Sequence, residues 1–194
     1  ALRPIDARNA EACTVRGQYR RGSVGGQPTP GYLEELGAEE SDTETFVAIR
    51  AEVANWRWAG VPFYLRTGKR LPEKRTEIVI QFKELPHSIF DNDRGQVAAN
   101  RLVIELQPQE DISLSVMNKR PGLDQRMQLQ PIRMSLSWGQ DDRNAKPPRR
   151  RIAYERLLLD VIAGRLNLFV RSDEQEEAWR WVEPILQYWK NDPA

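Results

Sequence analysis

The chain has 194 residues, of which 40% are hydrophobic and 29% are charged, and its formal net charge is +1. This length allows one domain with a substantial core, and the near-neutral charge argues against a surface built to bind a polyanion. The single cysteine, Cys13, excludes an internal disulfide framework and a cysteine-rich metal site. No signal-peptide pattern or membrane-spanning apolar run is present. We expect a cytoplasmic protein and, because the chain begins with Ala1 rather than Met, a piece of a longer one.

The first part of the chain carries few signals of regular structure. Residues 1–14 are polar and look like a lead-in segment. The following stretch, Val15–Gly37, holds too many glycines and prolines for long helices or strands. It is either a flexible linker or an ordered loop pinned by Tyr19, Tyr32 and Leu33.

A two-residue periodicity begins at Thr43 and predicts a strand with one buried face. The residues on that face are Thr45, Val47, Ile49, Ala51 and Val53. Trp56 and Trp58 follow with the same spacing. We predict that they lie on one side of an extended segment and cover a sheet.

The next segment joins two apolar runs, Val61–Leu65 and Ile78–Phe82, through a strongly basic connection. Gly68 and Pro72 interrupt regular structure within this connection, which predicts two strands joined across a turn. Its cations are Arg66, Lys69, Arg70, Lys74 and Arg75. Such a connection is either a receptor for a small anion, since lysine and arginine both donate to phosphate, or a solvated basic turn.

Three more alternating runs, Asn100–Gln107, Asp111–Lys119 and Gln130–Trp138, are separated by short turn sequences. Parallel strands need longer crossovers, so the short spacing favours antiparallel pairing. The strands together predict one large, mixed but mainly antiparallel sheet of at least five or six strands.

A helical period replaces the alternation after the charged segment Gly139–Arg151. Apolar side chains recur at helical spacing from Tyr154 to Arg165. A second helix is predicted to begin at Ser172, with Gln175 in the capping-box position. Pro184 should kink this helix or end it early. The predicted class is α+β, with helices packed on one face of the sheet and residues 1–194 forming a single domain.

The sequence offers little catalytic chemistry of its own. No strand, glycine-rich turn and helix follow one another as in a dinucleotide-binding domain. Gly68-Lys69 looks like the end of a phosphate-binding loop, but Arg70 stands where serine or threonine is required. The only histidine, His87, is best interpreted as a surface or packing residue. We assign no catalytic residue.

Six sequence blocks resemble glucose-6-phosphate dehydrogenase, and they occur in the order found in that family. The block NWRWAGVPFYLRTGKRLP is the longest and the most specific. The blocks are Val15–Tyr19, Pro30–Glu35, Glu44–Arg50, Asn55–Pro72, Ala153–Asp160 and Phe169–Trp179.

This resemblance implies the C-terminal substrate and dimerisation domain of an enzyme that oxidises glucose 6-phosphate to 6-phosphogluconolactone. The reaction transfers a hydride to NADP, or to NAD in some members, and begins the pentose phosphate pathway. In the family, an N-terminal Rossmann-type domain binds the cofactor and the catalytic histidine also precedes this region. We therefore expect the isolated chain to be inactive.

The resemblance also implies three substrate-binding residues. Lys69 and Lys74 fall on the two family lysines that hold the sugar phosphate through charge-assisted hydrogen bonds. Gln107 occupies a strand-end position that some members use for substrate contact.

Some family members hold a second, structural NADP on this domain. Arg66 and Arg75 fit that pattern, but Val79 and Glu105 stand where arginines are expected. A carboxylate at that place would repel the 2′-phosphate, which argues against a structural NADP site on this chain.

The expected partners are glucose 6-phosphate, the enzyme's own N-terminal domain, and a second copy bound through the sheet in a homodimer or tetramer. A non-catalytic assembly module built on the sheet remains an alternative. A third hypothesis is nucleic-acid binding through the basic connection, against which the near-neutral charge counts. No membrane partner is expected.

Overall fold

The computed structural model describes residues 2–84, 98–108, 110–121, 129–137 and 153–191. The chain divides into two compact units, a first unit of residues 1–72 and 151–194 and a second unit of residues 73–150. His87 and the charged segment Gly139–Arg151 lie outside the described residues. The assignment of the chain to a single domain stays a prediction.

The first unit is built on a three-stranded antiparallel sheet in the order β1 (Thr14–Gly17), β4 (Phe46–Glu52) and β5 (Pro62–Gly68). The predicted buried face of the central strand is confirmed. Val47 and Ile49 pack against the hydrophobic core, and Ala51 is only 1% exposed.

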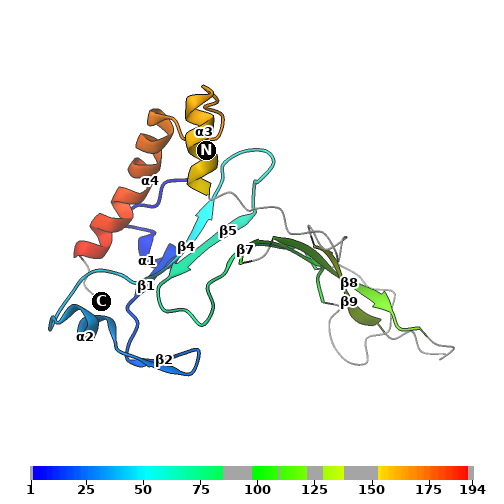
Figure 1. Cartoon of the computed structure of the whole chain (residues 1–194), viewed down its shortest axis with the longest axis horizontal. Coiled ribbons are helices and arrows are strands. Elements are labelled where there is room, and N and C mark those ends of the chain that lie inside the picture. Colours follow the sequence, from blue (N-terminus) through cyan, green and yellow to red (C-terminus); the bar gives the residue numbers. More distant parts are fainter. Residues whose placement is uncertain (1, 85–97, 109, 122–128, 138–152, 192–194) are drawn as a thin grey trace. The chain divides into compact units, whose positions relative to one another are not determined.

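One long helix, α4 (Ser172–Asn191), packs on this sheet together with the short helix α1 (Ala10–Cys13). In Figure 1, α4 lies beside α1, β1 and β4. The indole Nε1 of Trp189 donates a 3.1 Å hydrogen bond to the Thr14 hydroxyl, and Arg16 donates a 2.8 Å bond to the Trp189 carbonyl. The buried core residues of this unit are Ile5, Ala10, Ile185 and Trp189.

Helix α4 begins at Ser172 as predicted, but its capping interaction is shifted by one residue. Glu174, rather than Gln175, accepts a 3.0 Å hydrogen bond from the backbone N–H of Arg171. Of the two predicted effects of Pro184, an early end of the helix is excluded, because the helix continues to Asn191. Burial of side chains in the turns after the proline offsets the backbone hydrogen bond that proline cannot donate.

Helix α3 (Ala153–Ile162) ends sooner than its apolar pattern suggests. Gly164 has a φ of +67° and donates to the Val161 carbonyl, while Arg165 donates to the Asp160 carbonyl, which is a Schellman motif. Ile162 is 83% exposed. The predicted packing of this helix on the sheet is therefore not found among the described residues.

The segment between β1 and β4 is an ordered loop, so the second of the two interpretations is correct. It contains a hairpin of β2 (Gly22–Val24) and β3 (Gln27–Thr29), followed by the short helix α2 (Tyr32–Leu36). The Tyr19 and Tyr32 rings meet edge to face at 5.7 Å. The Leu33 carbonyl accepts a 3.2 Å hydrogen bond from Ala38.

The two tryptophans after β4 do not lie on an extended segment as predicted. Residues 55–60 form a turn, in which the Asn55 side chain accepts a 2.9 Å hydrogen bond from the backbone N–H of Trp58. The Trp58 ring packs edge to face on Phe63 at 5.3 Å, whereas Trp56 is fully exposed. A side chain that accepts from the backbone offers the chain a turn in place of an extended strand.

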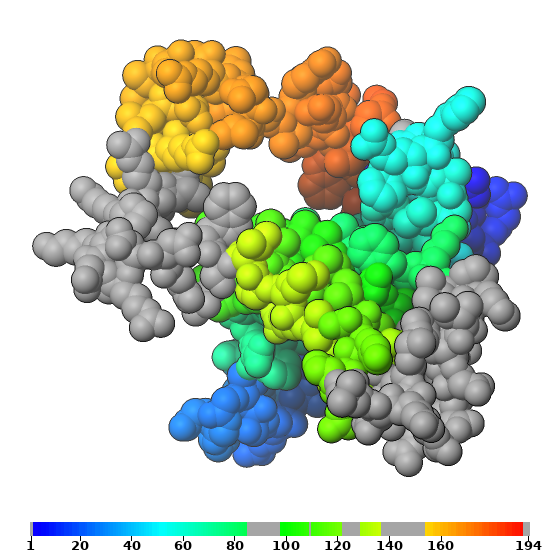
Figure 2. Space-filling view, turned by 90° about the vertical axis from the view of Figure 1, so that its right-hand side faces the viewer, coloured from blue at the N-terminus to red at the C-terminus, as the bar shows by residue number. Residues whose placement is uncertain are grey.

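The second unit is a four-stranded antiparallel meander of consecutive strands, whose described surface is green to yellow-green in Figure 2. They are β6 (Thr76–Gln81), β7 (Arg101–Gln107), β8 (Asp111–Lys119) and β9 (Leu129–Ser137). The register aligns two apolar rows on one face, since alternate residues of a strand share a face. These rows are Ile80, Leu102, Leu114 and Met134, and Ile78, Ile104, Ile112 and Leu136.

The α+β class and the antiparallel pairing are confirmed, but the prediction of one large sheet is wrong for the described residues. The strands form sheets of three, two and four strands. β5 pairs with β4 and β6 pairs with β7, so the two strands that flank the basic connection are not partners of each other. Strand periodicity fixes which face is buried and carries no information on the partner strand. No helix in the described part of the chain is both long enough and apolar enough to cross a bilayer.

Candidate functional site

The basic connection starts where β5 ends, at Gly68, and the backbone there lies against Phe46. A Cβ added to Gly68 would stand 2.9 Å from Cδ2 of the Phe46 ring, closer than real Cβ contacts. Glycine is therefore required at this position for the close approach. This contact fixes the point from which Lys69 leaves the sheet.

Lys69 is exposed, and its backbone N–H donates a 2.8 Å hydrogen bond to the Thr45 carbonyl. The next residue, Arg70, has a φ of +54°, a left-handed conformation that is uncommon for residues other than glycine. The Arg70 guanidinium forms an ion pair with Glu35 of α2. Lys69 is thus presented from a short segment that is held on both sides.

Lys74 and Gln107 belong to the second unit, whereas Lys69 belongs to the first. Thr76, the first residue of β6, is paired in register with Gln107, the last residue of β7. Lys74, two residues before Thr76, therefore lies at the same end of the β6–β7 pair as Gln107. Both side chains are exposed.

The cations of the basic connection fall into two groups. Arg75 forms ion pairs with Glu77 at 3.1 Å and with Glu105 at 3.2 Å, and Arg70 pairs with Glu35 as described above. Arg66, Lys69 and Lys74 have no ion-pair partner among residues 2–84, 98–108, 110–121, 129–137 and 153–191. A phosphate group that binds any one of these cations would not have to displace a carboxylate from the described residues.

The contacts around Glu35 shift three pKa values. The hydrogen bond from Tyr19, and then the hydrogen bond and charge of Arg70, hold the pKa of Glu35 below its ordinary value. The bond to Glu35 raises the pKa of Tyr19, because ionised Tyr19 could no longer donate it. Contacts with Tyr19 and Glu35 raise the pKa of Arg70 further above its already high value. All three groups keep their usual charge at neutral pH.

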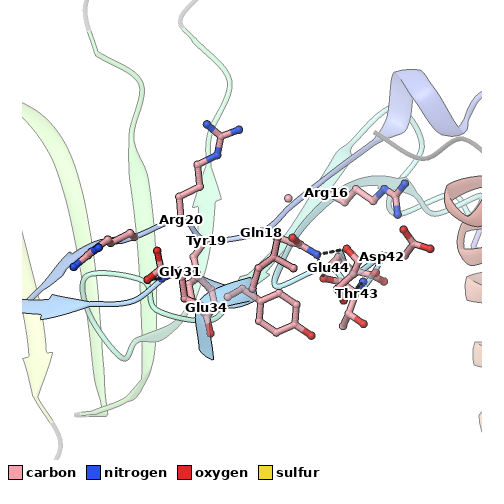
Figure 3. Close-up of a pocket in the computed structure, with 14 residues that line it drawn as sticks. Arg16, Gln18, Tyr19, Arg20, Gly31, Glu34, Asp42, Thr43 and Glu44 are labelled. Atoms are coloured by element: carbon pink, nitrogen blue, oxygen red, sulfur yellow. Dashed lines mark hydrogen bonds between the residues drawn. The ribbon is translucent and has the colours of Figure 1, made fainter. Parts of the chain in front are cut away.

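A separate pocket of about 670 Å³ lies in the first unit, between the end of β1, α2 and the segment before β4. Figure 3 shows Gln18 directed toward Thr43, whose carbonyl accepts a 2.8 Å hydrogen bond from the Gln18 side chain. Arg20 and Glu34 also line the pocket, so its charge is mixed. None of the three predicted substrate residues lines it. In the part of the chain that is described, no cluster of metal-binding side chains is present.

Comparison with known proteins supplies the family. Residues 1–194 match the family described as "Glucose-6-phosphate dehydrogenase, C-terminal domain". The chain belongs to this family. It is 56% identical over 191 residues to glucose-6-phosphate 1-dehydrogenase of Rhizobium meliloti and 52% identical to that of Zymomonas mobilis. These alignments take in 98% of this chain but only 38% and 39% of the two relatives.

Solved structures of the glucose-6-phosphate dehydrogenase family share the fold. One, titled "Glucose-6-phosphate dehydrogenase in complex with its substrate glucose-6-phosphate", has a TM-score of 0.78 at 37% identity. It matches 97% of this chain and 36% of its own length. The enzyme from Mycobacterium avium has a TM-score of 0.71 at 34% identity over the whole chain and 36% of its own length. The chain thus spans less than two fifths of the relatives it matches.

Sequence reasoning missed the residues that hold the basic connection in place. Glu35 precedes Arg70 by 35 positions, and no periodicity or motif links a helix residue to a loop residue at that distance. The available signal was Tyr19, which pins the loop in one of the two interpretations of residues 15–37 and which donates a hydrogen bond to Glu35.

Proposed function

We propose that the full-length protein carrying this chain is a glucose-6-phosphate dehydrogenase and that this domain holds the phosphate end of the substrate. The supporting observation is the pair of exposed lysines, Lys69 and Lys74, without carboxylate partners among the described residues of a chain in this family. A lysine ammonium binds phosphate as a compact point charge with three donors. Gln107, at the same end of the β6–β7 strand pair as Lys74, would add an uncharged hydrogen bond to the sugar.

The role of these residues is to position the substrate rather than to break bonds. In the proposed reaction, NADP bound to another domain would supply the hydride acceptor for the C1 carbon of glucose 6-phosphate, which lies at the far end of the sugar from the phosphate. Fixing the phosphate lowers the entropy that must be lost when C1 meets the cofactor. We assign no catalytic residue to this chain and propose that it has no dehydrogenase activity by itself. A cytoplasmic location remains our prediction.

The test is the kinetics of Lys69→Ala and Lys74→Ala in the full-length enzyme. Loss of a charge-assisted hydrogen bond costs about 1.5–3 kcal/mol, so Lys69→Ala should lower kcat/KM for glucose 6-phosphate by roughly ten- to a hundredfold. Lys74→Ala should act in the same direction but less. The KM for NADP should barely change, because the cofactor is expected to bind another domain.

Lys83→Ala serves as the matched control, since Lys83 is an exposed lysine just after β6 with no assigned role. Its kinetics should equal those of the unmodified enzyme. Indistinguishable kinetics for Lys69→Ala and Lys83→Ala would mean that Lys69 is a solvated loop charge.

We further propose that the domain lacks a second, structural NADP site. The Glu105 carboxylate projects from β7, where it would repel a 2′-phosphate, and it already pairs with Arg75, one of the two cations that fit such a site. Arg75 is shared with Glu77 as well. A nucleotide would therefore have to compete with two carboxylates for this guanidinium.

A second role, assembly, is supported by the apolar face of the second unit. Leu136 is 70% exposed, and Ile78, Ile80 and Met134 are each at least 41% exposed. Exposed apolar patches of this kind mark interaction surfaces. We propose that two copies associate through this face with twofold symmetry, which would combine the substrate-binding and assembly roles in one domain.

A further inference from the structure

The segment that carries Lys69 is held by three residues outside the predicted substrate site: Tyr19, Glu35 and Arg70. Arg70 follows Lys69 directly and has a φ of +54°. This left-handed conformation is energetically unfavourable for any residue that carries a side chain. Its ion pair with Glu35 offsets part of that cost and restrains the chain just after Lys69.

Glu35 is itself held at both carboxylate oxygens. One oxygen pairs with the Arg70 guanidinium, and the other accepts a 2.5 Å hydrogen bond from the Tyr19 hydroxyl. The Tyr19 ring packs on Tyr32, whose backbone N–H donates a 3.0 Å hydrogen bond to the Tyr19 carbonyl. Because both oxygens are engaged, Glu35 cannot rotate away from Arg70 without losing a second contact.

The backbone on the other side of Arg70 is tied to the same residues. The Lys69 N–H donates to the carbonyl of Thr45, and the Thr45 hydroxyl accepts a 2.9 Å hydrogen bond from the backbone N–H of Tyr19. Thr45 is 8% exposed, so this anchor is buried. Lys69 is therefore bracketed by a backbone anchor at Thr45 and a side-chain anchor at Arg70, and Tyr19 contributes to both.

We propose that Tyr19, Glu35 and Arg70 are positioning residues that fix Lys69 for the phosphate of glucose 6-phosphate. This inference rests on the proposed function of Lys69. A lysine has a long flexible stem, and holding its backbone in place lowers the conformational entropy lost when the ammonium binds. The three residues thereby act on substrate binding without contacting the substrate.

The experiment is a double-mutant cycle in the full-length enzyme between Glu35→Gln and Lys69→Ala. Glu35→Gln keeps an acceptor for Tyr19 but removes the charge that holds Arg70. Solvent screening keeps the contribution of an exposed ion pair small, so Glu35→Gln should raise the KM for glucose 6-phosphate by only about two- to fivefold. The kcat and the KM for NADP should stay within about 1.5-fold of the values for the unmodified enzyme.

In the Lys69→Ala background, Glu35→Gln should have no further effect, because the residue it positions is gone. Tyr19→Phe provides a milder second variant and should raise the same KM by less than Glu35→Gln does. Glu39→Gln is the control, since Glu39 is an exposed carboxylate in the loop after α2.

Three results would overturn the inference. If the KM for glucose 6-phosphate is unchanged in both Glu35→Gln and Tyr19→Phe but raised in Lys69→Ala, the positioning role is contradicted while the proposed function of Lys69 stands. An equal effect of Glu35→Gln with and without Lys69 would show a general structural role. An unchanged KM in Lys69→Ala would instead contradict the proposed function, and the inference would fall with it.

Discussion

At the residue scale, the ion pair between Glu35 and Arg70 makes a part of the stability depend on pH. The pKa of Glu35 in the folded chain lies below its ordinary value of 4.5, because of Tyr19 and then Arg70. A group with a lowered folded pKa stabilises the fold above its unfolded pKa, and this contribution is lost as pH falls through the folded value. Both side chains are partly exposed, so solvent and salt weaken the contribution.

We therefore expect Glu35→Gln to be less stable than the unmodified chain at pH 7 and the difference to shrink below about pH 4. Urea denaturation at a series of pH values measures it. The exposed Glu39→Gln should show no such pH-dependent difference. A Glu35→Gln difference that stays constant from pH 7 to pH 3 would contradict the assignment.

Gly68 provides a second prediction at this scale. Gly68→Ala would place a Cβ 2.9 Å from the Phe46 ring, so we expect a loss of about 1–3 kcal/mol in the free energy of unfolding from overpacking. Gly17→Ala is a matched control. Gly17 also pairs in register with Phe46, but no atom lies within 4 Å of its added Cβ. Equal denaturation midpoints for the two variants would show that the ring moves aside freely.

At the scale of elements, α4 is the helix that completes the core of the first unit. Ile185 is 1% exposed and packs with Trp189 against β4. Ile185→Ala should therefore lower the free energy of unfolding by about 2–4 kcal/mol, through lost burial and the cavity left behind. The measurement is chemical denaturation followed by circular dichroism.

Leu186→Ala tests the same helix one position further on. Leu186 is 38% exposed, so its truncation should cost roughly 1 kcal/mol or less. Similar losses for the two variants would mean that α4 is not anchored through the face that bears Ile185.

At the scale of the whole molecule, self-association is expected through the apolar face of the second unit. Leu136→Lys would place a charge on this face, where burial in an interface would be costly, and should convert a dimer to a monomer. The exposed position of Leu136 means that the folded protomer should tolerate the change. Sedimentation over a wide range of concentrations measures the oligomeric state.

Ser135→Lys is the control for this prediction. Ser135 directly precedes Leu136 in β9, so it lies on the opposite face of the strand, and it is exposed. It should leave the association unchanged. Equal dissociation by both variants, or a monomer at all concentrations without any substitution, would contradict the proposed interface.

The sequence by itself determined the class, the existence of most strands and helices, and the candidate binding residues. The two-residue period located the buried face of β4, because strand geometry alone dictates that alternation. Lys69 and Lys74 were identified from a motif, which depends only on neighbours in the chain, and their role in binding remains a prediction.

The tertiary structure alone decided which strands pair, which cations are neutralised and how Lys69 is held. Strand pairing and ion pairs join residues that are far apart in the sequence, as with Arg70 and Glu35. Neither the composition nor a local motif indicates which distant residues will meet. The same reason applies to Pro184. The local rule allowed either a kink or an early end, and the helix continues to Asn191 because Ile185 and Trp189 are buried beyond the proline. Local signals specify elements, whereas long-range packing decides between the arrangements that those elements permit.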